Sequence, residues 1–83
     1  MELHYTQAAF EQLSELPAKT RERIAAKVDF YAAQTDPLEF AQPLSGYAGY
    51  RFRVGDFRII FEIVADKIVI VAITKRDKAY RDL

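Results

Sequence analysis

The segment from Gly49 to Thr74 constrains the fold most, because apolar and polar side chains alternate along two consecutive runs. The first run, residues 50–54, reads YRFRV, and the second, residues 57–63, reads FRIIFEI. Period-two alternation in aromatic and β-branched residues is typical of half-buried β-strands. The two runs are separated by Gly55-Asp56, and a two-residue loop with glycine first suits a type II′ turn. The segment therefore predicts a β-hairpin.

The predicted turn also sets which residues face each other across the hairpin. Val54 then faces Phe57, and Arg53 faces Arg58. Because successive side chains of a strand point to opposite faces, Arg51, Arg53 and Arg58 should share one face of the sheet. Like charges placed directly opposite each other cost stability. Such a cluster indicates a face that binds a polyanion; the alternative is an ordinary solvated face on which salt screens the repulsion.

The whole chain predicts an α+β fold with the element order βααβββ. A short strand over residues 2–5 precedes two helices, over 7–16 and 19–34, in which apolar residues recur every three or four positions. A last strand is expected over residues 67–74. We predict one domain, residues 1–83, in which a helical hairpin packs on a small, antiparallel, twisted sheet and a short C-terminal helical turn follows.

Two details of this scheme can be compared directly with a structure. The first helix should be capped by the Thr6 hydroxyl and bury one apolar stripe. The members of that stripe are Ala9, Phe10, Leu13 and Leu16. Pairing of the last two strands should bring Ile59 opposite Ala72. The side chains expected beside the arginines are then Ile60, Val69, Val71 and Ile73.

The charge of the chain is balanced overall but unevenly distributed. Residues 1–45 contain four basic and seven acidic side chains, whereas residues 46–83 contain eight basic and five acidic ones. A basic half on a neutral protein favours a local phosphate-binding site over a long electrostatic footprint.

The sequence also limits the compartment and the chemistry. There is no cysteine and only one histidine, His4. Because no group of metal-ligating residues occurs at ligand spacing, we expect neither a metal nor a cofactor. The N-terminus lacks the pattern of a signal peptide, and charged residues interrupt the most apolar run, 59–73. We therefore expect a cytoplasmic location without membrane insertion.

Clustered arginines and a C-terminal phenol favour one reaction type. A ribose 2′-hydroxyl can attack the adjacent phosphate when guanidinium groups stabilise the charge that builds on the phosphate oxygens. In the C-terminal segment Arg76 and Tyr80 are four residues apart, hence on one side of a helical turn. Neighbouring cations lower the pKa of a phenol, so Tyr80 could act as a general base. The alternative is that Tyr80 packs against the edge of the sheet.

The run GYRFRVGDFRIIFEI, the IVIVAI strand and the basic tail with its tyrosine resemble the RelE/ParE toxin superfamily of bacterial toxin–antitoxin modules. RelE-like members cleave mRNA in the ribosomal A site without metal and leave a 2′,3′-cyclic phosphate. The resemblance implies that Arg51 and Arg53 bind RNA and that Arg58 contacts the scissile phosphate.

Two further roles in the C-terminal segment are carried over from the same resemblance. Arg76 corresponds to a proposed leaving-group acid, and Tyr80 to a proposed base. Lys75 stands where many relatives carry histidine, and we expect it to bind phosphate.

The resemblance further implies partners. These are a cognate antitoxin protein, the ribosome with its mRNA, and operator DNA that the toxin–antitoxin complex contacts through the antitoxin. Two other functions stay open at this point. One is ParE-like inhibition of DNA gyrase, which needs no catalytic residues, and the other is an inactive interaction protein with the toxin fold.

Overall fold

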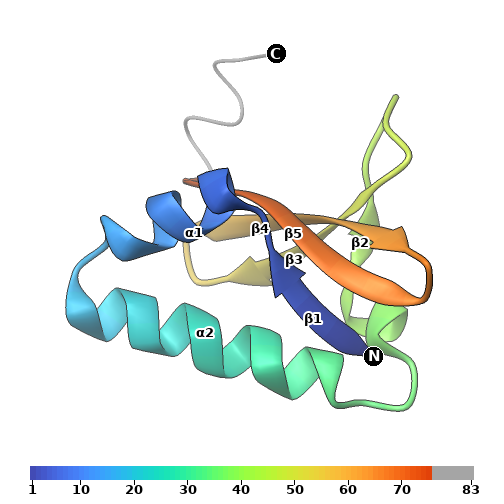
Figure 1. The fold of residues 1–83 in the computed structure, drawn as a ribbon, viewed down its shortest axis with the longest axis horizontal. Coiled ribbons are helices and arrows are strands. Elements are labelled where there is room, and N and C mark those ends of the chain that lie inside the picture. Colours follow the sequence, from blue (N-terminus) through green and yellow to red (C-terminus); the bar gives the residue numbers. More distant parts are fainter. Residues whose placement is uncertain (76–83) are drawn as a thin grey trace.

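The computed structural model describes residues 1–75 and confirms the α+β class, with two N-terminal helices packed on a sheet (Figure 1). The predicted C-terminal helical turn falls on residues 76–83, outside the described residues. The elements are β1 (Glu2–Tyr5), α1 (Gln7–Ser14), α2 (Ala18–Ala32), the 3₁₀ helix η1 (Pro37–Phe40), β2 (Gln42–Pro43), β3 (Tyr50–Val54), β4 (Phe57–Val64) and β5 (Lys67–Lys75).

The sheet is mixed, which corrects the prediction of an antiparallel one. Its five strands lie in the order β1-β5-β4-β3-β2, and β1 runs parallel to β5 while all other neighbours are antiparallel. The amide of Thr6 extends the parallel ladder by donating to the Ile70 carbonyl at 2.9 Å. Alternation of apolar and polar residues indicates that a segment is a strand, but it does not indicate whether the strand runs parallel or antiparallel to its neighbour. The parallel pairing of β1 with β5 could therefore not be predicted from the sequence pattern.

Helix α1 begins at the predicted residue, and α2 begins one residue before the predicted start, at Ala18. The Thr6 hydroxyl accepts a hydrogen bond from the Ala9 amide at 3.1 Å and so caps α1. Pro17 opens α2, where a missing amide hydrogen costs nothing. In α1, Ala9 and Leu13 are buried, but Phe10 is 60% exposed and does not belong to the buried stripe. The single turn from Ala9 to Leu13 is enough to contact the sheet.

One layer of buried apolar side chains joins the helices to the sheet. The helices contribute Ala9, Leu13, Ile24, Val28 and Ala32, and the strands contribute Phe52, Val54, Ile59, Phe61, Ile68, Ile70 and Ile73. The rings of Phe52 and Phe61 stack with centroids 4.3 Å apart at the centre of this core. Because both helices cover the same face of the sheet (Figure 1), the opposite face carries the side chains of the other parity.

A β-bulge changes the predicted register in β5. Ile60 pairs with Ala72 and Phe61 with Ile70, so Val71 is an extra residue without a direct partner on β4. Beyond the bulge the parity of β5 is inverted. Ile59 therefore pairs with Ile73 rather than with Ala72 as expected.

Candidate nucleic-acid interface

The predicted arginine cluster is present on the face of the sheet opposite the helices. Arg53 pairs with Arg58 and Arg51 with Ile60, as the hairpin register requires. Only glycine has a positive φ in this turn, at Gly55 with φ 58°, which agrees with the expected type II′ geometry. A conformation that favours glycine thus fixes the position of Arg53 and Arg58.

The three arginines differ in their surroundings. Arg53 is exposed, Arg51 is half-buried, and Arg58, on the central strand β4, is buried to 8% exposure. The Arg51 guanidinium donates to the Gln42 side-chain oxygen at 2.6 Å, which ties it to β2 at the edge of the sheet. Gln42 is not among the predicted site residues, because no strand was expected between the second helix and residue 50.

A small pocket of about 70 Å³ lies at the end of this hairpin, lined by Arg53, Gly55, Asp56, Phe57 and Arg58. A volume of about 10–15 Å³ is enough for one water-sized group, so the pocket has room for the oxygens of a single phosphate. Two arginines and one aspartate are among its lining residues. This composition favours a small anion held by arginine, whose planar donors match a phosphate in a bidentate manner.

The side chains beside the arginines are not those expected. The inverted parity beyond the bulge moves Ile73 into the core, at 7% exposure. Ala72 and Thr74 take its place next to Ile60 and Arg58. The Thr74 hydroxyl, opposite Arg58, is buried and makes no hydrogen bond to any residue of the range 1–75. The surroundings of the arginines are therefore more polar than expected, because Thr74 lies opposite Arg58 and Ile73 lies in the core.

Lys75 ends β5 and lies on the other side of the strand from Thr74. Its register partner is Phe57, and its ammonium nitrogen lies 5.8 Å from the centre of the Phe57 ring. Since Phe57 also lines the pocket, one aromatic ring separates Lys75 from the arginines. Arg76 and Tyr80, the other two predicted site residues, lie outside the described residues.

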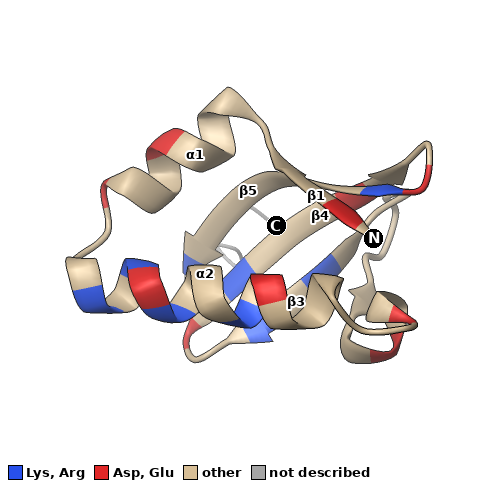
Figure 2. Ribbon diagram, turned by 60° about the horizontal axis from the view of Figure 1, so that its bottom comes forward, with Lys and Arg blue, Asp and Glu red and all other residues tan. Residues whose placement is uncertain are grey.

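A fourth arginine reaches the hairpin from the helical layer. Both terminal nitrogens of Arg23, in α2, lie 3.1 Å from the position that a β-carbon on Gly55 would occupy. Figure 2 shows the basic residues of α2 and those of the β3–β4 hairpin. The sequence pattern gives no signal that Arg23 meets the turn, because the two are about thirty residues apart in the chain.

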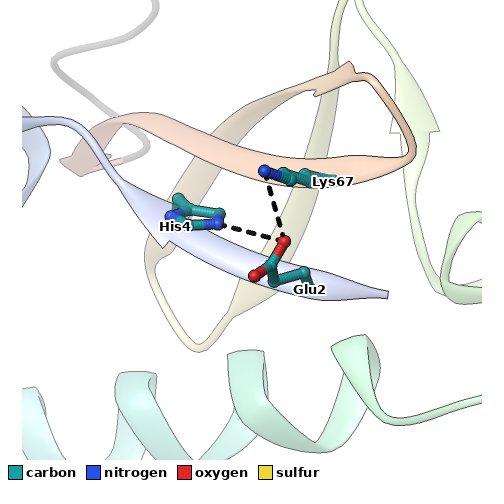
Figure 3. Close-up of polar contacts among 3 residues, drawn as sticks. All are labelled: Glu2, His4 and Lys67. Carbon is teal, nitrogen blue, oxygen red and sulfur yellow. Dashed lines mark ion pairs between the residues drawn. The ribbon is translucent and has the colours of Figure 1, made fainter.

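The far end of the arginine face carries a separate charged cluster (Figure 3). The Glu2 carboxylate lies 3.4 Å from His4 Nε2 and 3.4 Å from Lys67 Nζ. The hydrogen bonds from His4 and then Lys67 lower the pKa of Glu2 below its ordinary value. This cluster joins β1 to β5 and does not contain the predicted site residues.

Two general properties complete the description of residues 1–75. No group of three or more His, Cys, Asp or Glu side chains is placed to hold a metal ion within that range. Neither helix in it is long and apolar enough to cross a membrane.

The family model described as "ParE toxin of type II toxin-antitoxin system, parDE" matches residues 3–80, almost the full length of the chain. The chain belongs to the ParE toxin family. It is thus a toxin of the RelE/ParE superfamily of type II toxin–antitoxin systems, as its sequence predicts. A search of curated proteins gives no match.

Solved structures show the same fold for this ParE-family chain. The RelB–RelE antitoxin–toxin complex from Methanococcus jannaschii matches with a TM-score of 0.76 at 22% identity, over 96% of this chain and 98% of that one. The chromosomal ParDE system from P. aeruginosa matches with a TM-score of 0.75 at 18% identity, over 90% and 95%. The RelBE2 complex from Mycobacterium tuberculosis gives 0.70 at 25% identity, over 90% and 96%. RelE and ParE toxins thus share the backbone of this chain.

Proposed function

We propose that this ParE-family chain is a toxin that cleaves mRNA on the ribosome and so inhibits translation, without a metal in the reaction. The observation that carries the proposal is the pairing of Arg53 with Arg58 at one small pocket, with Arg58 buried. Two like charges placed directly opposite each other cost stability, and a phosphate bound by both guanidinium groups would offset that cost.

The proposed reaction is transfer of a phosphoryl group within the RNA strand, from the 5′-oxygen of one nucleotide to the 2′-oxygen of the preceding one. The ribose 2′-oxygen attacks the adjacent phosphorus, the bond from phosphorus to the 5′-oxygen breaks, and a 2′,3′-cyclic phosphate and a 5′-hydroxyl result. Arg58 and Arg53 stabilise the charge on the phosphate oxygens during this step. Tyr80 takes the proton of the 2′-hydroxyl and Arg76 assists the leaving oxygen, roles that rest on the family resemblance.

The residues around this pair are proposed to hold the RNA in place. Arg51, fixed by Gln42, binds a neighbouring phosphate at the edge of the sheet. Lys75 adds a positive charge on the far side of Phe57. Neither group needs to change its protonation state for this role.

The test is expression of the chain from an inducible promoter, with primer-extension mapping of cellular mRNA. We expect Arg58→Ala to lower the cleavage rate about 10²- to 10³-fold, as for loss of one donor to a developing oxyanion. Lys67→Ala is the matched control, because Lys67 lies on the same face at its other end. Cleavage and growth arrest that persist unchanged in Arg58→Ala would contradict the proposal.

Inhibition of DNA gyrase is the second candidate function, and the ParE family match favours it. It predicts loss of supercoiling activity when the purified chain is added to gyrase, with protein synthesis initially intact. In that case the arginine face would bind a protein or DNA and Arg58→Ala would leave mRNA untouched. An inactive chain would give neither effect.

The proposed cellular partner is a cognate antitoxin. The relatives from Methanococcus jannaschii and Mycobacterium tuberculosis were solved as antitoxin–toxin complexes. We propose that an acidic antitoxin segment covers the arginine face of this chain, where its carboxylates would pair with the guanidinium groups. The complex is proposed to bind operator DNA through the antitoxin.

A further inference from the structure

The position of Arg23 joins the helical layer to the arginine face at one point, the β3–β4 turn. Its two terminal guanidinium nitrogens lie 3.1 Å from the place that a β-carbon on Gly55 would take, and its central carbon lies 3.3 Å from it. The guanidinium can lie this close because Gly55 has no side chain. Gly55 also lines the pocket that contains Arg53 and Arg58.

The other basic residues of α2 make different contacts or are exposed. Arg21 Nη1 lies 3.4 Å from the Leu16 carbonyl, at the break between the helices. Lys27 lies 6.0 Å from the centre of the Phe30 ring. Lys19 is exposed one helical turn before Arg23. Arg23 is thus the basic residue of α2 for which the structure shows a contact with the hairpin turn.

Among the described residues 1–75, three arginines and one aspartate lie at or beside this turn. Arg23 lies against Gly55, which also lines the pocket with Arg53 and Arg58, and Asp56 is the acidic residue of the turn. An extended anion that passes around the turn would contact all three guanidinium groups. A nucleic-acid backbone is such an anion, because it carries one charge per nucleotide at regular spacing.

We propose that Arg23 binds the phosphate of a nucleotide adjacent to the one held by Arg53 and Arg58, so that a single RNA strand runs from the sheet face around the β3–β4 turn to α2. The proposal rests on the proposed function, since it takes the same RNA as the ligand. Arg23 is a positioning residue here: it contacts the backbone beside the reacting phosphate and stabilises the strand in one direction across the site.

The test is the affinity of the purified full-length chain for a fluorescein-labelled single-stranded RNA, measured by anisotropy at several KCl concentrations. We expect Arg23→Ala to weaken binding about five- to tenfold, as for the loss of one ordinary hydrogen bond at a solvent-exposed position. The slope of log affinity against log salt should fall by about 0.7, because the variant neutralises one phosphate fewer on a single strand. Arg23→Lys should recover part of the affinity, because the charge is kept but the bidentate geometry is not.

Lys19→Ala is the matched control, since it removes the same charge from the same helix one turn away. It should change the affinity less than about twofold, because an exposed charge that does not touch the RNA acts only through the screened field. Equal losses of affinity in Arg23→Ala and Lys19→Ala would overturn the proposal in favour of a diffuse field. Arg23→Gln, with its melting temperature checked, repeats the comparison if the alanine variant unfolds.

Failure of this inference is distinguishable from failure of the proposed function. If Arg58→Ala weakens RNA binding but Arg23→Ala does not, the inference alone is wrong. If neither Arg58→Ala nor Arg53→Ala weakens it, the arginine face does not hold RNA and both are wrong. If Arg23→Ala weakens binding of an acidic peptide but not of RNA, the turn contacts a protein partner and the inference is overturned.

Discussion

At the scale of single residues, position in the sheet decides what each arginine can do. The alternation of the sequence predicts the same face, and no difference in burial, for Arg51, Arg53 and Arg58. Arg58 lies on β4, between β3 and β5, and is therefore surrounded and buried, whereas Arg53 on β3 is exposed. A buried guanidinium is weakly screened by salt, so its effect on a bound phosphate is larger than that of an exposed one. Arg58 is the residue on which the proposed chemistry depends most.

The contact between Arg23 and Gly55 predicts a difference between two glycine substitutions. Gly55 and Gly46 both have positive φ, at 58° and 77°, so alanine at either position is strained by about 1–2 kcal/mol. A β-carbon at Gly46 meets nothing within 4 Å, whereas at Gly55 it meets Arg23. The new β-carbon at Gly55 would displace the flexible end of Arg23 by a few tenths of an ångström, so we expect Gly55→Ala to lower the free energy of unfolding only slightly more than Gly46→Ala, as measured by urea denaturation. The double variant Arg23→Ala/Gly55→Ala should recover the difference; no recovery would show that Arg23 does not pack there.

At the scale of elements, the turns of the two hairpins differ in the residues that adopt a positive φ. The β3–β4 turn uses glycine, but the β4–β5 turn places Ala65 and Asp66 at φ 51° and 62°. Positive φ at both central residues is the geometry of a type I′ turn, which matches the twist of the strands but strains residues with a β-carbon. Neither residue is the one that this geometry favours at its position.

The strained β4–β5 turn predicts a stabilising double substitution. Ala65→Asn together with Asp66→Gly installs the residues preferred in a type I′ turn, and we expect a gain of about 1 kcal/mol. The melting temperature of this small domain should rise by about 4–8 °C. Asp56→Gly in the other hairpin is the control, since Asp56 does not have positive φ and added flexibility there should lower the stability. A melting temperature unchanged by the double substitution would contradict the assignment of strain.

At the scale of the whole molecule, the N-terminal strand β1 forms one edge of the sheet and pairs with β5, which lies far from it in the sequence. β1 pairs with β5, and Gln12 of α1 accepts a hydrogen bond from the Ile73 amide at 2.7 Å. The helical hairpin and the last strand are therefore held together by contacts between segments about sixty residues apart. Loss of β1 should free one edge of β5 and weaken the arginine face through β4.

The docking of β1 predicts a loss of stability in alkaline solution. Burial, and then the nearby Asp29 carboxylate, raise the pKa of Tyr5 above its usual value of about 10. The folded state therefore holds this proton more tightly than the unfolded state. The stabilisation is present in full below pH of about 10 and is lost as the pH rises through the folded pKa. Urea denaturation between pH 8 and 11 should show this loss in the wild type and not in Tyr5→Phe.

Tyr47→Phe is the control for that pH profile, because this substitution removes the same hydroxyl from a side chain that is 78% exposed. It should follow the wild-type curve at every pH. A Tyr5→Phe profile that coincides with the wild type would show that β1 does not keep Tyr5 buried in solution.

The amino-acid sequence alone determined the two helices, the strands β1, β3, β4 and β5, and which residues face each other in the β3–β4 hairpin. Capping by Thr6, the break at Pro17 and the glycine turn at Gly55 are local preferences of a few neighbouring residues, and local preferences are readable from a sequence. The same holds for the shared face of Arg53 and Arg58, which follows from the turn and the two-residue period of a strand.

The tertiary structure decided the properties that depend on distant segments. The parallel pairing of β1, the bulge that moves Ile73 into the core, and the approach of Arg23 to Gly55 each join residues far apart in the chain. The bulge depends on how β5 packs against α1 and β4 together, and no periodicity within β5 indicates it. The sequence therefore predicts which arginines share a face, and the packing of distant segments decides which of them is buried and which further cation joins them.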